Sequence, residues 1–261
     1  FKQKTAYEIK ECDWSSDVCS SDLTLDGTKT HKLVLEGLFG PVERVTTTKE
    51  LINKGQLADF EIKCLVLKHA DEICESMKKS EYKNELEYLI LHEERNKFIK
   101  NLAVSLNKNT LILYQMVDKH GKILYNMIKN TEKIGNRKVF FVHGGTDTAD
   151  REEIRRIMEV EKDAIVVASF GTFSTGINIR NLHNIIFASP SKSRVRNLQS
   201  IGRGLRKGES KDQATLYDIA DDMRYKKTMN FTLKHFVERS KIYSEEKFPF
   251  KIYKINLKHG K

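Results

Sequence analysis

The chain has 261 residues, a formal net charge of +10 and a sequence pI near 9.3. Its 39% hydrophobic and 31% charged residues are typical of a globular chain long enough to bury a core. No apolar run approaches the roughly 20 residues that span a bilayer, and residues 1–10 lack the features of a signal peptide. The four cysteines include no Cys-x-x-Cys pair, which excludes a zinc site or a disulfide framework. The excess of Lys and Arg favours a polyanionic partner, most often nucleic acid, in a reducing cytosol; a basic surface that serves only solubility is the alternative.

The first 23 residues differ from the rest. Residues 13–23 read Asp-Trp-Ser-Ser-Asp-Val-Cys-Ser-Ser-Asp-Leu, have no helical or strand period and include the single Trp. They resemble the conceptual translation of a common sequencing adapter, so we expect residues 1–23 to be artefactual or unstructured. A flexible acidic linker is the alternative, and Cys12 and Cys19 have no predicted chemistry in either case.

Residues 24–60 are expected to be a linker that contains a short helix at 47–54, begun by a capping box. Residues 61–68 alternate weakly and predict a strand, in which Cys64 is a small core residue. Residues 71–85 are charged and irregular, which is typical of a surface excursion.

From residue 87 onward, helices and strands alternate. Helices are predicted at 87–106, 119–130, 146–159, 193–208 and 231–246. A short apolar run predicts a buried strand at 111–114, and further strands are predicted at 139–142, 164–168, 184–188 and 215–219. This order indicates βαβ units and an α/β fold with a parallel sheet buried on both faces, over one domain at 61–247. Residues 248–261 are predicted to form a basic tail.

The segment 193–208 has the most informative spacing. Read as a helix, it has an apolar stripe made by Val195, Leu198, Ile201 and Leu205. Arg203 and Arg206 fall on one polar flank with Gln199, and guanidiniums held in this way suit forked contacts with phosphate oxygens. Gly202 costs roughly 1 kcal/mol relative to Ala in a helix, which predicts a close backbone approach or a helix end. A solvated basic helix is the alternative.

A second candidate site follows the predicted strand at 164–168. The loop 169–178 contains two glycines and four hydroxyl residues. Gly171 and Gly176 permit unusual backbone angles, and the free N–H groups, with the hydroxyls of Thr172, Ser174 and Thr175, could cradle a phosphate. Ligands of open α/β sheets bind beyond the carboxyl ends of strands. A loop that merely makes turns is the alternative.

These segments resemble the motifs of superfamily-two helicases and translocases. Gln-x-x-Gly-Arg-x-x-Arg at 199–206 resembles motif VI, and residues 111–115 resemble motif IV, followed by a strand with a His-Gly turn. The stretch 169–178 resembles motif V, in which Ser174, Thr175 and Gly176 match the family's positions. The most detailed resemblance is to the UvsW-type recombination helicases of T4-like phages. It is carried by Gly-Leu-Phe-Gly-Pro at 37–41, Phe-Ser-Thr-Gly-Ile at 173–177, Asn-Leu-His at 181–183 and Ile-Gly-Arg-Gly-Leu-Arg-Lys at 201–207.

The resemblance implies a RecA-like three-layer fold, with a mainly parallel central sheet and helices on both faces. It implies branched or single-stranded DNA as partner, ATP and Mg²⁺ as cofactors, and the cytoplasm of a phage-infected host as location. The catalytic residues would be Arg203 and Arg206, one of them an arginine finger. The residues near the nucleotide would be Gln199, Gly202, Gly176 and Asn178. The residues contacting DNA would be Ser174, Thr175, Gln115, His143 and Gly144. Ser200 and Asn178 depart from the pattern, where Arg and Asp are frequent.

Two features of a complete motor are missing from the sequence. It contains no Gly-x-x-x-x-Gly-Lys-Ser/Thr phosphate loop and no Asp-Glu-x-His run that could hold Mg²⁺. We therefore expect a second motor domain, inactive alone, whose nucleotide is held mainly by a missing first RecA-like domain. A non-catalytic DNA-binding or annealing module, or the motor part of a restriction enzyme, remains the alternative.

Overall fold

The computed structural model describes residues 48–55, 57–176, 179–189, 200–202 and 213–257, together with Leu33 and Gly37. For residues 48, 49, 53 and 174–176 only the backbone is described.

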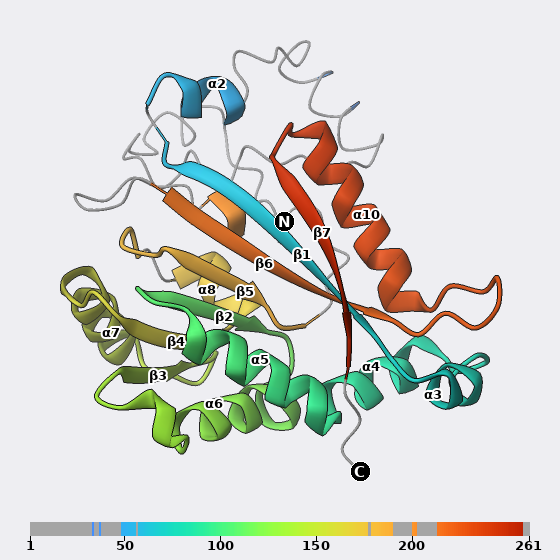
Figure 1. The fold of residues 1–261 in the computed structure, drawn as a ribbon. Helices are drawn as coiled ribbons and strands as arrows, with labels where there is room; N and C mark the ends of the chain where they lie inside the picture. Colours follow the sequence, from blue (N-terminus) through green and yellow to red (C-terminus); the bar gives the residue numbers. More distant parts are fainter. Residues whose placement is uncertain are drawn as a thin grey trace.

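Within the described residues, seven strands form one sheet in the order β3-β4-β2-β5-β6-β1-β7 (Figure 1). The strands are β1 Asp59–Lys68, β2 Thr110–Tyr114, β3 Lys138–Val142, β4 Ala164–Ser169, β5 Asn184–Phe187, β6 Gln213–Asp222 and β7 Phe250–Asn256. Every pairing between these strands is parallel. All carboxyl ends therefore meet at one edge, the carboxyl edge, and all amino ends at the opposite amino edge.

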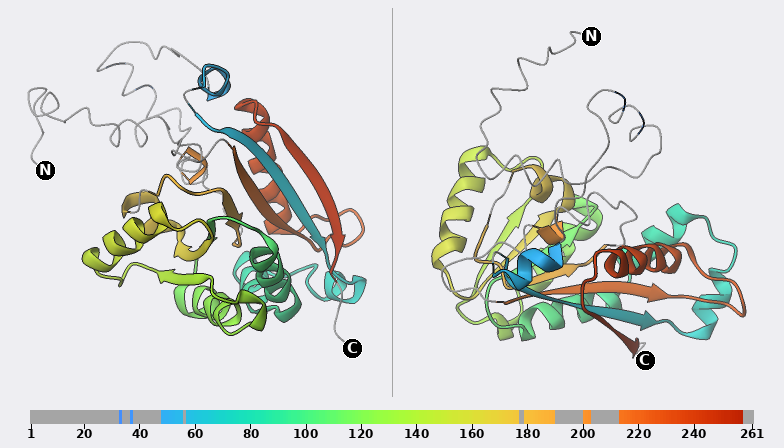
Figure 2. Two further views of the ribbon diagram at one scale, coloured as in Figure 1. Left: turned by 60° about the vertical axis from the view of Figure 1, so that its left-hand side comes forward. Right: turned by 90° about the horizontal axis from the view of Figure 1, so that it is seen from above.

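Helices cover both faces of this sheet (Figures 1 and 2). The helices of the described residues are α2 Thr48–Asn53, α3 Asp71–Ser76, α4 Tyr82–Leu91, α5 Glu93–Ser105, α6 Lys122–Lys129, α7 Thr148–Val160, α8 Phe170–Gly176 and α10 Phe231–Glu245, with a π-helical turn η1 at Val117–Gly121 and a 3-10 turn η2 at Glu132–Ile134. One core cluster joins the sheet to α7, α8 and α10, and a second joins it to α5 and α6. The α/β fold with a parallel sheet that the sequence pattern predicts is confirmed, and so is the RecA-like three-layer arrangement that the resemblance implies.

Strand β2 shows why the sheet lies in the interior. All five of its residues are buried; Leu111 and Leu113 face the first core cluster, whereas Ile112 and Tyr114 face the second. Successive side chains of a strand point to opposite faces, so a strand covered on both sides needs an unbroken apolar run. The predicted small core residue Cys64 is likewise fully buried, and burial raises the pKa of its thiol.

The predicted helix at 87–106 is instead two helices, α4 and α5. They are separated at His92, whose backbone is extended at φ −66° and ψ 114°. The His92 ring accepts a hydrogen bond from the Arg95 amide at 3.2 Å and so caps α5. Such a side-chain cap satisfies an amide that begins a helix and has no partner within it.

The prediction of an irregular surface excursion at 71–85 was wrong, because α3 and the start of α4 occupy this range. Glu85 is only 2% exposed, and its carboxylate accepts hydrogen bonds from the amides of Phe231 and Thr232 at 2.9 and 2.7 Å. It therefore caps the amino end of α10, a partner 146 positions away in the sequence that local pattern does not reveal.

The residues assigned to a basic tail also belong to the sheet. Strand β7 pairs with β1 from Ile62 opposite Phe250 to Lys68 opposite Asn256. It is an edge strand of the described sheet, so its lysines stay exposed and its composition resembles that of a tail. The domain therefore extends past residue 247 and, because β1 begins at Asp59, slightly into the predicted linker. None of the helices in the described ranges combines the length and hydropathy needed to cross a bilayer.

Candidate functional site

The carboxyl edge brings together three of the segments chosen from the sequence. Gln115 directly follows β2, His143 and Gly144 directly follow β3, and α8 begins where β4 ends. Because β3, β4 and β2 are neighbours in the sheet, these segments are adjacent along one edge. Gln115 and Gly144 are exposed and His143 is half-buried, so a ligand outside the edge can reach them.

The turn at His143 is held by its own hydrogen bonds. The His143 amide donates to Thr146 Oγ1 at 3.0 Å, and the His143 ring accepts from the Gly145 amide at 3.0 Å. Arg151, on the first turns of α7, donates to the Gly144 carbonyl at 2.9 Å. The sequence did not single out Arg151, since only the fold brings the first turns of α7 back over this loop.

The predicted Gly-rich loop at 169–178 is corrected by the structure, because residues 170–176 form helix α8. Ser169 Oγ accepts from the Thr172 amide at 3.2 Å, which starts the helix, and Phe173 is fully buried. Gly171 lies within this helix and is not among the glycines with positive φ, so it supplies no unusual backbone angle. The side chains of Ser174 and Thr175, with residue Gly176, lie beyond what is described; Asn178 is outside the described residues altogether.

The motif VI segment is described only at 200–202; Gln199, Arg203 and Arg206 lie outside the described residues. Ile201, from the predicted apolar stripe, is 1% exposed and belongs to the same core cluster as Phe173 of α8. A Cβ placed on Gly202 would meet nothing within 4 Å among the described residues, so no close approach to them requires a glycine there.

A buried polar network lies directly beneath this edge. Asp221, near the end of β6, is fully buried and accepts hydrogen bonds from Arg95 Nε at 3.0 Å and from His69 Nε2 at 3.1 Å. Arg95 also donates to the Ala188 carbonyl at 2.8 Å, just past β5. Burial alone raises the pKa of Asp221, but the Arg95 charge and the hydrogen bonds outweigh burial and lower this pKa to about 2. Arg95, through the ionised Asp221 carboxylate and the Ala188 carbonyl, therefore links α5 to the ends of β6 and β5.

The network continues to Gln115 through His120. Asn96 Nδ2 donates to the Ile90 carbonyl at 2.8 Å, so Asn96 Oδ1 is the group that accepts from His120 Nε2 at 3.2 Å. His120 Nδ1 is then an acceptor, and the Ser189 hydroxyl donates to it at 3.0 Å. Ser189 Oγ in turn accepts from the Gln115 amide at 3.1 Å. Burial, with the nearby Arg95 charge, lowers the pKa of His120 to about 3, so the ring is neutral at pH 7.

A second buried ion pair ties β6 to α10. Arg239 donates to Asp218 from Nη2 at 2.8 Å, and the Tyr243 hydroxyl donates to the same carboxylate at 2.8 Å. Burial raises the pKa of Tyr243, and the neighbouring Asp218 charge raises it further, so this hydroxyl remains a donor. The Asp residues inside the apolar run of β6 were the available sequence signal, because a buried carboxylate needs a partner.

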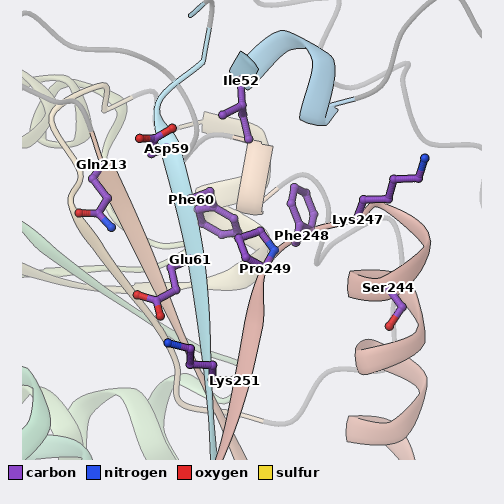
Figure 3. Close-up of a pocket in the computed structure, with 10 residues that line it drawn as sticks. All are labelled: Ile52, Asp59, Phe60, Glu61, Gln213, Ser244, Lys247, Phe248, Pro249 and Lys251. Carbon is purple, nitrogen blue, oxygen red and sulfur yellow. The ribbon is translucent and has the colours of Figure 1, made fainter. Parts of the chain in front are cut away.

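The cavity at the opposite end of the sheet is a poorer candidate for the functional site than the carboxyl edge. A cavity of about 640 Å³ lies at the amino edge, lined by Ile52, Asp59, Phe60, Glu61, Gln213, Ser244, Lys247, Phe248, Pro249 and Lys251 (Figure 3). It lies away from the carboxyl ends where ligands of parallel sheets bind. Within the described ranges, no group of three or more His, Cys, Asp or Glu side chains could hold a metal ion.

The helicase conserved C-terminal domain family matches residues 93–208, which include β2 to β5, α8 and the Arg-rich segment. The ATP-dependent DNA helicase uvsW of Enterobacteria phage T4 is 35% identical over 242 residues, which is 88% of this chain and 47% of that protein. This chain carries the C-terminal domain of a UvsW-like superfamily-two helicase. The chain thus spans about half the length of the curated relative that it matches.

Solved structures agree with this assignment to a helicase C-terminal domain. The crystal structure of T4 UvsW matches with a TM-score of 0.66 and 32% identity, covering 85% of this chain and 45% of that one. The ATP-dependent Type ISP restriction-modification enzyme LlaBIII, bound to DNA, matches with a TM-score of 0.58 and 15% identity over 85% of this chain and 17% of that chain. At 15% identity, the match to LlaBIII supports only the fold.

Proposed function

We propose that this domain is the second motor domain of an ATP-dependent DNA helicase that moves on branched or single-stranded DNA during phage recombination and replication. The observation that carries the proposal is the adjacency of Gln115, the His143 turn and α8 at one carboxyl edge, in a chain 35% identical to a DNA helicase. The net charge of +10 suits a polyanionic track. The proposed location is the cytoplasm of the infected host.

In this proposal, α8 and the two loops beside it hold the DNA backbone. Hydroxyls such as those of Ser174 and Thr175, in the last turn of α8, can bind phosphate oxygens without reading base sequence. Gln115, His143 and Gly144 extend that contact along the edge. Because Gln115 is hydrogen-bonded through Ser189 to the buried network, its position follows that of α5 and β6.

The proposed nucleotide lies between this domain and a first RecA-like domain. ATP with Mg²⁺ supplies the free energy of hydrolysis, and the phosphate loop of the first domain would hold it. Arg203 and Arg206 would approach its phosphates, with Gln199, Gly202, Gly176 and Asn178 near the nucleotide. An arginine supplied in this way accelerates phosphoryl transfer by roughly 10³-fold or more in comparable enzymes. Ile201, two residues before Arg203 in the sequence, is buried in the core.

The test joins this chain to a first motor domain that carries a phosphate loop, and measures ATP hydrolysis with and without DNA. Arg203→Ala and Arg206→Ala should each reduce DNA-stimulated hydrolysis at least 100-fold, while DNA affinity changes less than about threefold. Lys133→Ala, at an exposed lysine of η2, serves as the control and should alter neither. Normal turnover in both arginine variants would refute the finger assignment. DNA binding without any hydrolysis in the joined protein would instead favour the annealing module.

A further inference from the structure

A lysine-rich turn extends beyond the part of the carboxyl edge described above. Strand β6 pairs with β5 as far as Asp218 opposite Phe187, and then continues with β1 to Asp222. At about 3.3 Å per residue, these four further residues carry the chain roughly 13 Å past the end of that pairing. The segment 223–230, named here the lysine hairpin, lies next to α3 and the start of α10 (Figures 1 and 2).

The tip of the lysine hairpin is a two-residue turn made of Lys226 and Lys227. Tyr225 and Thr228 exchange backbone hydrogen bonds of 3.2 and 3.0 Å on either side of it. Lys226 has φ 52°, in the left-handed region, where a residue with a Cβ costs roughly 1 kcal/mol more than glycine. Both lysines are exposed. A lysine at a position that favours glycine slightly destabilises the turn, and it places a positive charge at the tip.

Aromatic rings hold further cations around this turn. Lys78 and Lys226 lie 5.0 and 5.3 Å from the centroid of the Tyr225 ring, and Lys234 lies 5.3 Å from that of Phe231. The Tyr225 hydroxyl is fixed by a 2.8 Å hydrogen bond to Glu75. A cavity of about 260 Å³ opens between these groups, and its lining includes Lys78, Lys79 and Lys234.

The nearby carboxylates are already engaged. Glu75 pairs with Lys78 at 3.4 Å, Asp222 pairs with Arg224 at 2.6 Å, and Glu85 caps α10. Within the described ranges, no carboxylate lies at ion-pair distance from the remaining four cations, Lys79, Lys226, Lys227 and Lys234. Their charge is therefore left for a partner.

The base of the lysine hairpin is held rigidly. Asn230 Oδ1 accepts from the Met223 amide at 3.1 Å, which closes the hairpin, and Asn230 Nδ2 donates to Glu85 at 2.9 Å. Met223 packs with Cys74 and Leu89 in a small core cluster of its own. A charged turn on such a support binds without first losing much conformational entropy.

We propose that the lysine hairpin is a second DNA-binding site, at which Lys226 and Lys227, with Lys79 and Lys234, bind phosphates of the DNA backbone. The site lies on the same edge as Gln115 and α8, and beyond them along β6, so it would extend the proposed DNA path past these residues. This inference rests on the proposed function, because it assumes that DNA runs along the carboxyl edge.

The test compares two double variants of the 261-residue chain. Lys226→Gly with Lys227→Ser removes two charges from the lysine hairpin. It also replaces the lysine whose backbone is left-handed by glycine, which adopts this conformation at lower cost. Lys108→Gly with Lys133→Ser is the control variant, with the same two kinds of substitution at the amino edge. Both lysines are exposed, and Lys108 also has a left-handed backbone, φ 70°. Fluorescence anisotropy of a labelled 30-nucleotide single strand, and of the same sequence as duplex, is measured over a salt series.

The hairpin variant should bind the duplex at least tenfold more weakly at 0.1 M salt, with the slope of log affinity against log salt reduced by roughly 2. The control variant should stay within about twofold. Both variants should melt no lower than the parent chain, which separates lost contacts from lost folding. Equal affinity of the hairpin variant and the parent chain on both DNAs would overturn the lysine hairpin alone. A parent chain that binds neither DNA at low salt would overturn the proposed function itself.

Discussion

The imidazole of His120 and the hydroxyl of Ser189 lie 3.0 Å apart in the interior, 69 positions apart in the sequence. This contact joins η1 to the end of β5. Ser189 Oγ also accepts a hydrogen bond from the Gln115 amide. One hydroxyl therefore sets the starting position of a proposed DNA-contact residue. Polar contacts that link buried elements in this way also restrict how those elements move relative to one another.

Replacing Ser189 by Ala should leave the His120 ring nitrogen and the Gln115 amide without partners. We expect the free energy of unfolding to fall by about 1–3 kcal/mol, the cost of a buried polar group that loses its hydrogen bond. Hydrogen exchange of the Gln115 amide should accelerate by roughly tenfold or more. Ser105→Ala is the control, since its hydroxyl donates to the Leu102 carbonyl on the exposed side of α5. An unchanged Gln115 exchange rate would show that Ser189 does not position this loop.

The neutral His120 ring predicts a specific loss of stability in acid. The folded protein holds this pKa at about 3, below the usual value of 6.5, so between these pH values the unfolded chain binds a proton that the folded chain does not. Stability is therefore fully present above about pH 6.5 and declines as the pH falls toward 3, by up to about 1.4 kcal/mol per pH unit.

The check is urea unfolding of the parent chain and of His120→Leu from pH 7.5 to 4.5. The variant should be less stable at pH 7.5, because Ser189 and Asn96 lose a partner. Its stability should nevertheless decline less steeply below pH 6.5, because it has no ring to protonate. Parallel pH profiles for the two proteins would contradict a buried neutral histidine.

Gly121 should be intolerant of even one added methyl group. A Cβ at this position would lie 2.5 Å from Cε2 of the fully buried Tyr114, whose hydroxyl donates to the Val142 carbonyl. Gly121→Ala should therefore lower the free energy of unfolding by about 1–3 kcal/mol through overpacking. Gly171→Ala is the matched control, since a Cβ there meets nothing within 4 Å, and it should be neutral or stabilising. Equal melting temperatures for the two variants would show that the Tyr114 ring moves aside freely.

Glu85 should contribute more to stability than any exposed carboxylate of α4. Its removal in Glu85→Ala leaves the Phe231 and Thr232 amides at the start of α10 without an acceptor, at an expected cost of about 2–4 kcal/mol. Glu81→Ala, at an exposed position one turn earlier, should cost less than about 0.5 kcal/mol. Guanidinium unfolding curves measure both, and similar values would remove Glu85 as the cap of α10.

Much of the fold could be predicted from the sequence, because it depends on local periodicity. The runs at 111–114, 139–142 and 164–168 were predicted to be strands, and β2, β3 and β4 confirm them within one residue at each end. Strands β2 and β4 are buried, whereas β3, the other edge strand of the described sheet, is mostly half-buried. Each of these strands is followed directly by a candidate site residue or segment, so the parallel sheet brings Gln115, His143 and α8 to one edge.

The sequence by itself therefore determined the alternation of strands and helices, the parallel sheet and the positions of the helicase motifs. Only the tertiary structure decided which buried charges pair, that β7 is a strand rather than a tail, and that α3, α4 and the lysine hairpin form one unit. The physical reason is distance along the chain. His69 meets Asp221 across 152 positions and Glu85 meets Thr232 across 147; such pairings depend on where the sheet brings remote segments together, which no local pattern encodes.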